Sequence, residues 1–95
     1  TVSGNATTGD WERGAPLGTL NGTAQSNPGA DVTNDFGSDA YVTGNGGGTA
    51  GSDDVDGGST ILTSPVFDLT TYNLPYLSYY RWWYNDGGGG AAAPG

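Results

Sequence analysis

The residues best suited to chemistry in this sequence are the carboxylates of the segment SDDVDGGS, residues 52–59. Asp53, Asp54 and Asp56 lie close together and are followed by two glycines. Carboxylate oxygens are preferred ligands of Ca²⁺, which accepts about six to eight oxygens in flexible geometry. Glycine allows the backbone to curl around such an ion. The spacing therefore makes calcium binding the first hypothesis.

The segment is not a self-contained calcium loop of the EF-hand type. With Asp54 and Asp56 at the third and fifth positions of that motif, Gly57 falls correctly at the sixth. Ser52 then occupies the first position, and Thr63 occupies the twelfth, where a bidentate Glu is required. A calcium site therefore needs ligands from another part of the chain.

A second acidic segment, DVTNDFGSD at residues 31–39, offers such ligands. Clustered carboxylates repel one another unless a cation lies between them, so one interpretation is a composite calcium site made from both segments. The other interpretation is an acidic turn in solvent, which Asp and Gly form unaided. The candidate ligands are Asp31, Asn34, Asp35, Asp39, Asp53, Asp54 and Asp56.

The overall composition excludes several classes of partner and reaction. The 95 residues include ten acidic and two basic side chains, with a formal net charge of −8. Such a chain repels nucleic acids and anionic membrane surfaces. Cys, His and Lys are all absent, which removes disulfides, thiolate zinc sites and the usual general bases. This profile, rich in Thr, Asn and Gly, is typical of extracellular β-proteins of microbes, so we expect an extracellular or cell-surface location.

Catalysis has little support in the sequence. Ser and Thr hydroxyls have no His or Lys to activate them. Asp10 and Glu12 share a strand face and could form a glycosidase pair, but nothing else marks a cleft there, and Arg13 beside them is typical of surface charge. We expect a non-catalytic protein.

Aromatic and asparagine residues suggest two roles for sugars. Trp11, Trp82 and Trp83 are candidates for stacking on sugar rings, but Trp82 and Trp83 lie in the strongest predicted strand and are expected in a hydrophobic core. Two Asn-X-Thr sequons, at Asn5 and Asn21, would allow N-glycosylation.

The pattern of the chain predicts strands and no helix. Apolar residues show no helical period, and Gly or Pro interrupts each candidate. Strands are expected at residues 8–13, 40–43, 59–62, 64–69 and 76–84, with long loops at 14–37 and 44–58. The segment at 76–84, YLSYYRWWY, is aromatic on both faces, as expected for a central strand of a two-layer sandwich. We expect a module at residues 1–86 and a Gly/Ala-rich tail or linker at 87–95.

Three segments appear in an order that resembles a known family: GDWERGAP, GSDDVDGGSTILTSPVFDLT and LSYYRWWYNDGG. Together they resemble the MAM-like, jelly-roll β-sandwich modules of secreted bacterial peptidases and surface proteins. The resemblance spans most of residues 9–88. It implies that LTSPVFDL and the aromatic strand are adjacent core strands, and that a calcium site lies near the acidic loop. Family modules continue with further strands, so the resemblance implies a partial module whose sheet another chain could complete.

These features lead to one expected function and one alternative. The fold class is all-β, a jelly-roll-like antiparallel sandwich with long Gly-, Asn- and Asp-rich loops. The expected function is a non-catalytic, calcium-stabilised structural or adhesive module, such as a filament subunit. Its expected partners are other copies of itself or neighbouring domains. The alternative is a carbohydrate-binding module of a secreted enzyme.

Overall fold

A computed structural model describes residues 1–84, and the expected tail at 87–95 lies outside the described residues. The described chain has no helix, which confirms the all-β class. A membrane-spanning helix is therefore also absent from these residues. Its strands are short because glycines and turns interrupt the sequence every few residues. They are β1 (Val2–Gly4), β2 (Glu12–Gly14), β3 (Thr19–Asn21), β4 (Ala24–Asn27), β5 (Ala40–Val42), β6 (Gly48–Thr49) and β7 (Thr60–Leu62).

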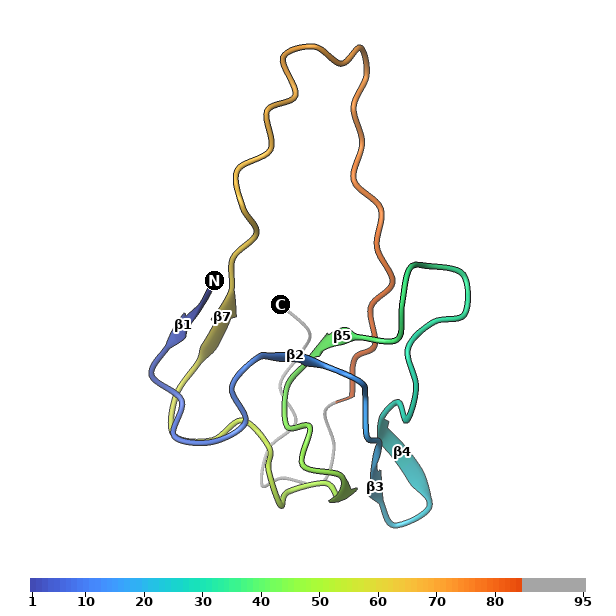
Figure 1. The fold of residues 1–95 in the computed structure, drawn as a ribbon. Coiled ribbons are helices and arrows are strands. Elements are labelled where there is room, and N and C mark those ends of the chain that lie inside the picture. Colours follow the sequence, from blue (N-terminus) through green and yellow to red (C-terminus); the bar gives the residue numbers. More distant parts are fainter. Residues whose placement is uncertain (85–95) are drawn as a thin grey trace.

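The strands of the described chain form three small sheets (Figure 1). β1 pairs with β7 and β2 pairs with β5, both antiparallel. The third sheet has the order β4-β3-β6, in which β3 runs antiparallel to β4 and parallel to β6. The two-layer jelly-roll arrangement stays a prediction, because these small sheets do not establish it.

The N-terminal segment is joined to the segment around β7 along its length. Beyond the β1–β7 ladder, the Thr63 amide donates to the Thr1 carbonyl at 2.8 Å. On the other side, the Asn5 amide donates to the Ser59 carbonyl at 2.9 Å, and Thr8 forms a bridge with Asp56. This seam places the acidic loop, residues 52–59, beside the start of the chain.

The β3–β4 hairpin lies in the region 14–37 that was expected to be a loop, so that expectation is wrong. Gly22 and Thr23 form its two-residue turn, and Gly22 has a φ of 60°, as type II′ turns require at their first central position. Hydroxyl groups hold the hairpin together, since Thr19 Oγ1 and Ser26 Oγ are 2.6 Å apart in a buried hydrogen bond. A polar hairpin of this kind carries no apolar alternation from which to predict it.

The core of the described residues is small and largely polar. Val42, 7% exposed, is the one large hydrophobic side chain that is buried in residues 1–84. Thr19, Ser26 and Asn45 are buried with it. Asn45 accepts a hydrogen bond from the Leu17 amide at 2.9 Å and donates one to the Ala15 carbonyl at 3.1 Å. Hydrogen bonds between loops therefore carry much of the organisation.

Residues 63–84 leave the body after β7, turn, and return to it (Figure 1). We call this segment the aromatic arm, with an outgoing leg at 63–69, a turn at 70–75 and a returning leg at 76–84. The turn is marked by a hydrogen bond from the Tyr72 amide to the Leu69 carbonyl, 3.1 Å, and by Leu74 with a φ of 61°. No strand is assigned to residues 63–84. The expected strand at 76–84 is thus extended but belongs to no sheet of the described chain, because its backbone has no pairing partner there.

Candidate functional site

The aromatic arm carries a large exposed apolar surface. Val66 is 98% exposed and Tyr76 is 91% exposed, whereas such side chains are usually covered in folded proteins. Contiguous exposed apolar surface is a feature of interaction sites. Its large exposed members are Val66, Phe67, Leu69, Tyr72, Leu74, Tyr76, Leu77, Tyr79, Tyr80, Trp82 and Trp83.

Both ends of the arm are attached to the body. The outgoing leg continues the β1–β7 ladder, and the returning leg reaches the β3–β4 hairpin. There Trp82 Nε1 donates to the Ser26 carbonyl at 2.7 Å, and Tyr84 Oη accepts from Asn21 Nδ2 at 3.0 Å. These attachments fix the roots of both legs and leave the side chains between them outside the body.

Trp82 and Trp83 were expected in a hydrophobic core, and that expectation is wrong for the described residues. Their exposed fractions are 54% and 51%. Burial of a strand that is aromatic on both faces needs a layer on each face, and residues 1–84 supply neither to this leg. Trp11 is more covered than either; it lies just before β2, and its amide donates to Thr60 Oγ1 at 3.1 Å.

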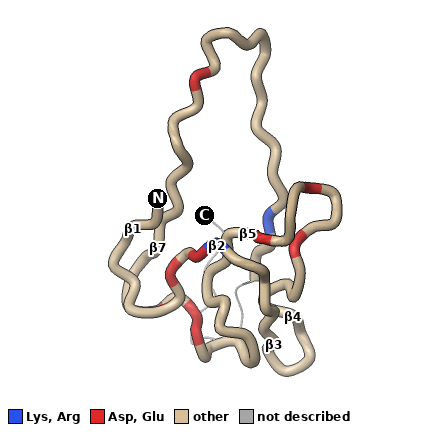
Figure 2. Tube along the Cα trace, viewed as in Figure 1, with Lys and Arg blue, Asp and Glu red and all other residues tan. Residues whose placement is uncertain are grey.

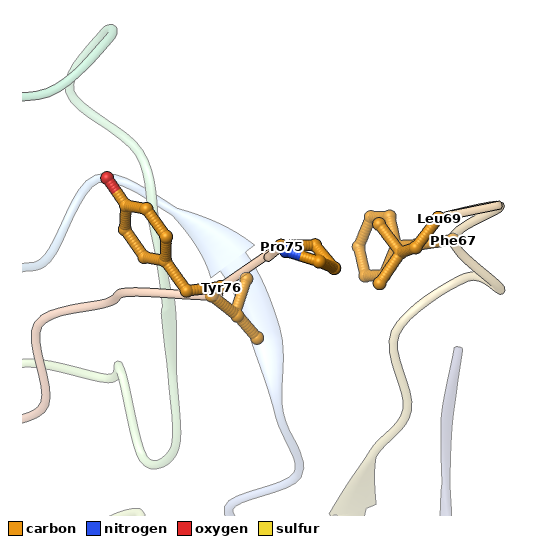
Figure 3. A pocket seen from close by; sticks show the side chains of 5 residues that line it. Phe67, Leu69, Pro75 and Tyr76 are labelled. Atoms are coloured by element: carbon orange, nitrogen blue, oxygen red, sulfur yellow. The ribbon is translucent and has the colours of Figure 1, made fainter. Parts of the chain in front are cut away.

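A shallow apolar pocket of about 240 Å³ lies between the two legs near the turn. Phe67 and Leu69 line it from the outgoing leg, Pro75 from the end of the turn, and Tyr76 and Leu77 from the returning leg. Figure 3 shows the Tyr76 hydroxyl directed away from the other lining side chains. The pocket therefore suits an apolar side chain. The sequence did not indicate this pocket, because the two segments were expected to be adjacent core strands.

Asp68, beside the turn of the arm, is held as a carboxylate. Its Oδ1 accepts hydrogen bonds from Thr70 Oγ1 at 2.7 Å and from the Thr70 amide at 3.0 Å. The side-chain bond and then the backbone bond lower the pKa of Asp68 below its ordinary value. The arm thus presents one firmly ionised group close to its tip.

The acidic loop binds the N-terminal segment through its backbone. Thr7 donates to the Asp56 carbonyl from its amide at 2.8 Å and from its hydroxyl at 3.1 Å, while Thr8 Oγ1 donates to the Asp54 carbonyl at 2.8 Å. These bonds use carbonyl oxygens and leave the exposed carboxylates of Asp54 and Asp56 available.

The second acidic segment has other contacts. Asp39 Oδ2 lies 2.8 Å from Arg13 Nη1 in an exposed ion pair between β2 and the start of β5. Asp31 Oδ1 accepts from the Val32 amide at 2.9 Å, and its Oδ2 is buried with no hydrogen-bond partner in the described chain. Asn34 and Asp35 are exposed.

The two acidic segments do not form one coordination shell in this structure. Figure 2 shows the acidic loop and the segment 31–39 on different sides of the body. Within residues 1–84, no group of three or more carboxylates is placed to hold a metal ion. The composite calcium site therefore stays a prediction that requires the loops to rearrange.

The sequon asparagines both take part in hydrogen bonds. Asn5 Oδ1 accepts from the Ser59 amide at 3.1 Å, and Asn21 bonds the returning leg as described above. Asn5 is exposed and Asn21 lies beside the hairpin turn. Their glycosylation stays a prediction.

Comparisons with protein-family models, with curated proteins and with solved structures found no match for this chain. The resemblance to MAM-like modules therefore rests on the sequence segments alone.

Proposed function

We propose that this protein is a non-catalytic, extracellular structural module that functions by assembly, in which the aromatic arm is buried against a neighbouring protein surface. The observation that carries the proposal is the arm itself. Its backbone is extended and outside any sheet of residues 1–84, and its large side chains are exposed.

Backbone hydrogen bonding and the burial of apolar side chains both favour packing of the arm against a partner. An extended segment outside a sheet offers a row of backbone donors and acceptors, a ready template for addition of another strand. Full burial of one large apolar side chain contributes about 1.5–3 kcal/mol, and the arm holds many of them. The apolar pocket near the turn would receive a side chain of the partner.

The composition supports the location and the calcium in this proposal. A net charge of −8 without lysine disfavours nucleic acids and anionic lipid surfaces and leaves cations as natural ligands. A domain with so small a core gains from a bound ion, which stabilises the folded state by mass action. Extracellular calcium would serve that purpose.

A second candidate function is carbohydrate binding, which the half exposure of Trp82 and Trp83 favours. Tryptophan rings present an apolar face with a polar edge and stack on sugar rings. On this hypothesis the protein is a monomer with measurable affinity for a polysaccharide, and its arm serves as the binding platform.

Sedimentation velocity on the full chain over a range of concentrations, with electron microscopy of the same samples, tests the proposal. Leu77→Asp places a charge on the arm and should dissociate the assembly. Leu17→Asp is the matched control, because Leu17 is also an exposed leucine but lies on the body. Discrete wild-type monomers at every concentration would refute assembly. Polysaccharide binding by those monomers, lost on replacement of Trp82 and Trp83 by alanine, would establish the alternative.

A further inference from the structure

We propose that the partner of the aromatic arm is the arm of a second copy of this chain, in a two-fold arrangement that places the tip of each arm at the root of the other. This inference rests on the proposed assembly function and specifies its partner and its geometry. Three features of the described residues support it: the division of charge, the length of the arm and the positions of its two ionic groups.

Charge is divided unequally between the body and the arm. Residues 1–62 contain eight acidic side chains and one arginine, a formal charge of −7, whereas residues 63–84 contain one acid and one base. Figure 2 shows most of the acidic stretches on the body. Contact between two bodies would bring like charges together, which is unfavourable. The neutral, apolar arm has no such penalty, so another neutral arm is the best-matched surface that this chain offers.

The length of the arm allows the two bodies to stay apart. A leg of about nine extended residues spans roughly 30 Å. In the proposed arrangement the bodies lie at opposite ends of the paired arms, separated by several times the Debye length of about 8 Å at physiological salt. An arm laid along the body of another copy would instead bring the two acidic bodies closer together. The division of charge therefore selects pairing of arm with arm.

The ionic groups of the arm are complementary in this arrangement. Asp68 is next to the turn, at the tip, and Arg81 is on the returning leg near its root. Both side chains are exposed. When the tip of one arm meets the root of the other, Asp68 of one copy approaches Arg81 of the second copy, and the two-fold symmetry makes a second such pair. If the two arms instead pointed in the same direction, Asp68 would lie beside Asp68 of the second copy and Arg81 beside Arg81, so like charges would meet.

A charge-exchange experiment tests the geometry. Asp68→Arg and Arg81→Asp each place like charges at both ends of the paired arms, and each should weaken self-association about tenfold or more. A mixture of the two variants should restore association, because both ion pairs form again between unlike copies. Asp35→Arg, on an exposed body loop, makes the same change of net charge as Asp68→Arg and should not weaken association.

The readout is sedimentation equilibrium of each variant alone and of the equimolar mixture, with one variant fluorescently labelled. Restoration in the mixture cannot come from a pair within one copy, so it supports pairing between arms. It also shows that both variants are folded. If wild type assembles and Leu77→Asp prevents it, but the mixture associates no better than the single variants, the arm–arm geometry is wrong while the assembly function stands. If wild type is monomeric, both proposals fail.

Discussion

Gly9 is a sensitive position in the seam between the N-terminal segment and the acidic loop. It is buried and has a φ of 71°, in the left-handed region. A Cβ built on it would lie 2.5 Å from the carbonyl carbon of Asp54, 2.6 Å from its oxygen and 2.7 Å from the amide nitrogen of Val55. All three are backbone atoms, so no change of rotamer can relieve the overlap. Gly9→Ala should therefore separate the two segments.

The expected loss of stability in Gly9→Ala has two parts. A residue with a Cβ in the left-handed region costs about 1–2 kcal/mol, and overpacking a filled site adds about 1–3 kcal/mol. The free energy of unfolding should thus fall by roughly 2–5 kcal/mol. For a domain of this size each kcal/mol lowers the melting temperature by about 4–8 °C. We expect Gly9→Ala to melt at least about 8 °C below wild type.

Gly22→Ala is the matched control. Gly22 has a φ of 60°, but a Cβ there would have no heavy atom within 4 Å. Only the conformational cost then applies, so this variant should lose about 1–2 kcal/mol. Melting followed by circular dichroism gives the stabilities. Hydrogen exchange of the Thr7 amide, which donates to the Asp56 carbonyl, reports on the seam and should accelerate in Gly9→Ala beyond its rate in Gly22→Ala. Equal melting temperatures for the two variants would refute the contact argument.

Three further predictions concern Asn45, Asp68 and the proposed calcium site. Asn45→Ala leaves two backbone partners in the buried region unpaired and should lower the free energy of unfolding by about 1–3 kcal/mol in urea titrations. Thr70→Val removes the hydroxyl bond to Asp68 and should raise the pKa of that carboxyl in an NMR titration. Because the folded pKa is depressed, its contribution to stability is present above the unfolded pKa and is lost as pH falls through the folded pKa. Calcium chelation should lower the melting temperature, and Asp54→Asn with Asp56→Asn should reproduce the loss.

Each of these three predictions would be contradicted by a specific result. An Asn45→Ala variant as stable as wild type would mean that water replaces the lost bonds without cost. An unchanged Asp68 titration in Thr70→Val would show that the turn does not persist in solution. Melting that is insensitive to both chelation and the paired Asp substitutions would reject the calcium site.

Two of the strands were predictable because their residues match the rules for strands. Residues 40–43 and 59–62 contain aromatic or β-branched side chains and were expected to be strands, and β5 and β7 lie there. β3 and β4 consist of Thr, Leu, Asn, Ala, Gln and Ser, and β1 and β6 end or begin at glycine. Hydroxyl and backbone hydrogen bonds stabilise these elements, so hydrophobic patterning could not reveal them.

The candidate site was predictable in its location but not in its exposure. The segment 76–84 stood out by aromatic residues on both faces, yet the sequence could not show whether a second layer covers them. Burial depends on a partner surface that local pattern does not specify. The acidic residues illustrate the same limit, since nothing in the spacing of Asp39 indicated that it would pair with Arg13 across β2 and β5.

The small polar core has a thermodynamic consequence. The heat capacity of unfolding comes mainly from exposure of apolar surface and is about 12–15 cal/mol/K per residue in ordinary domains. With Val42 as the one large hydrophobic side chain buried in residues 1–84, the isolated protomer should have a much smaller value and a correspondingly flat stability curve. Assembly through the arm would bury the missing apolar surface, so its calorimetric signature should be a large negative heat-capacity change. The association step would then carry the thermodynamic signature that other domains show on folding.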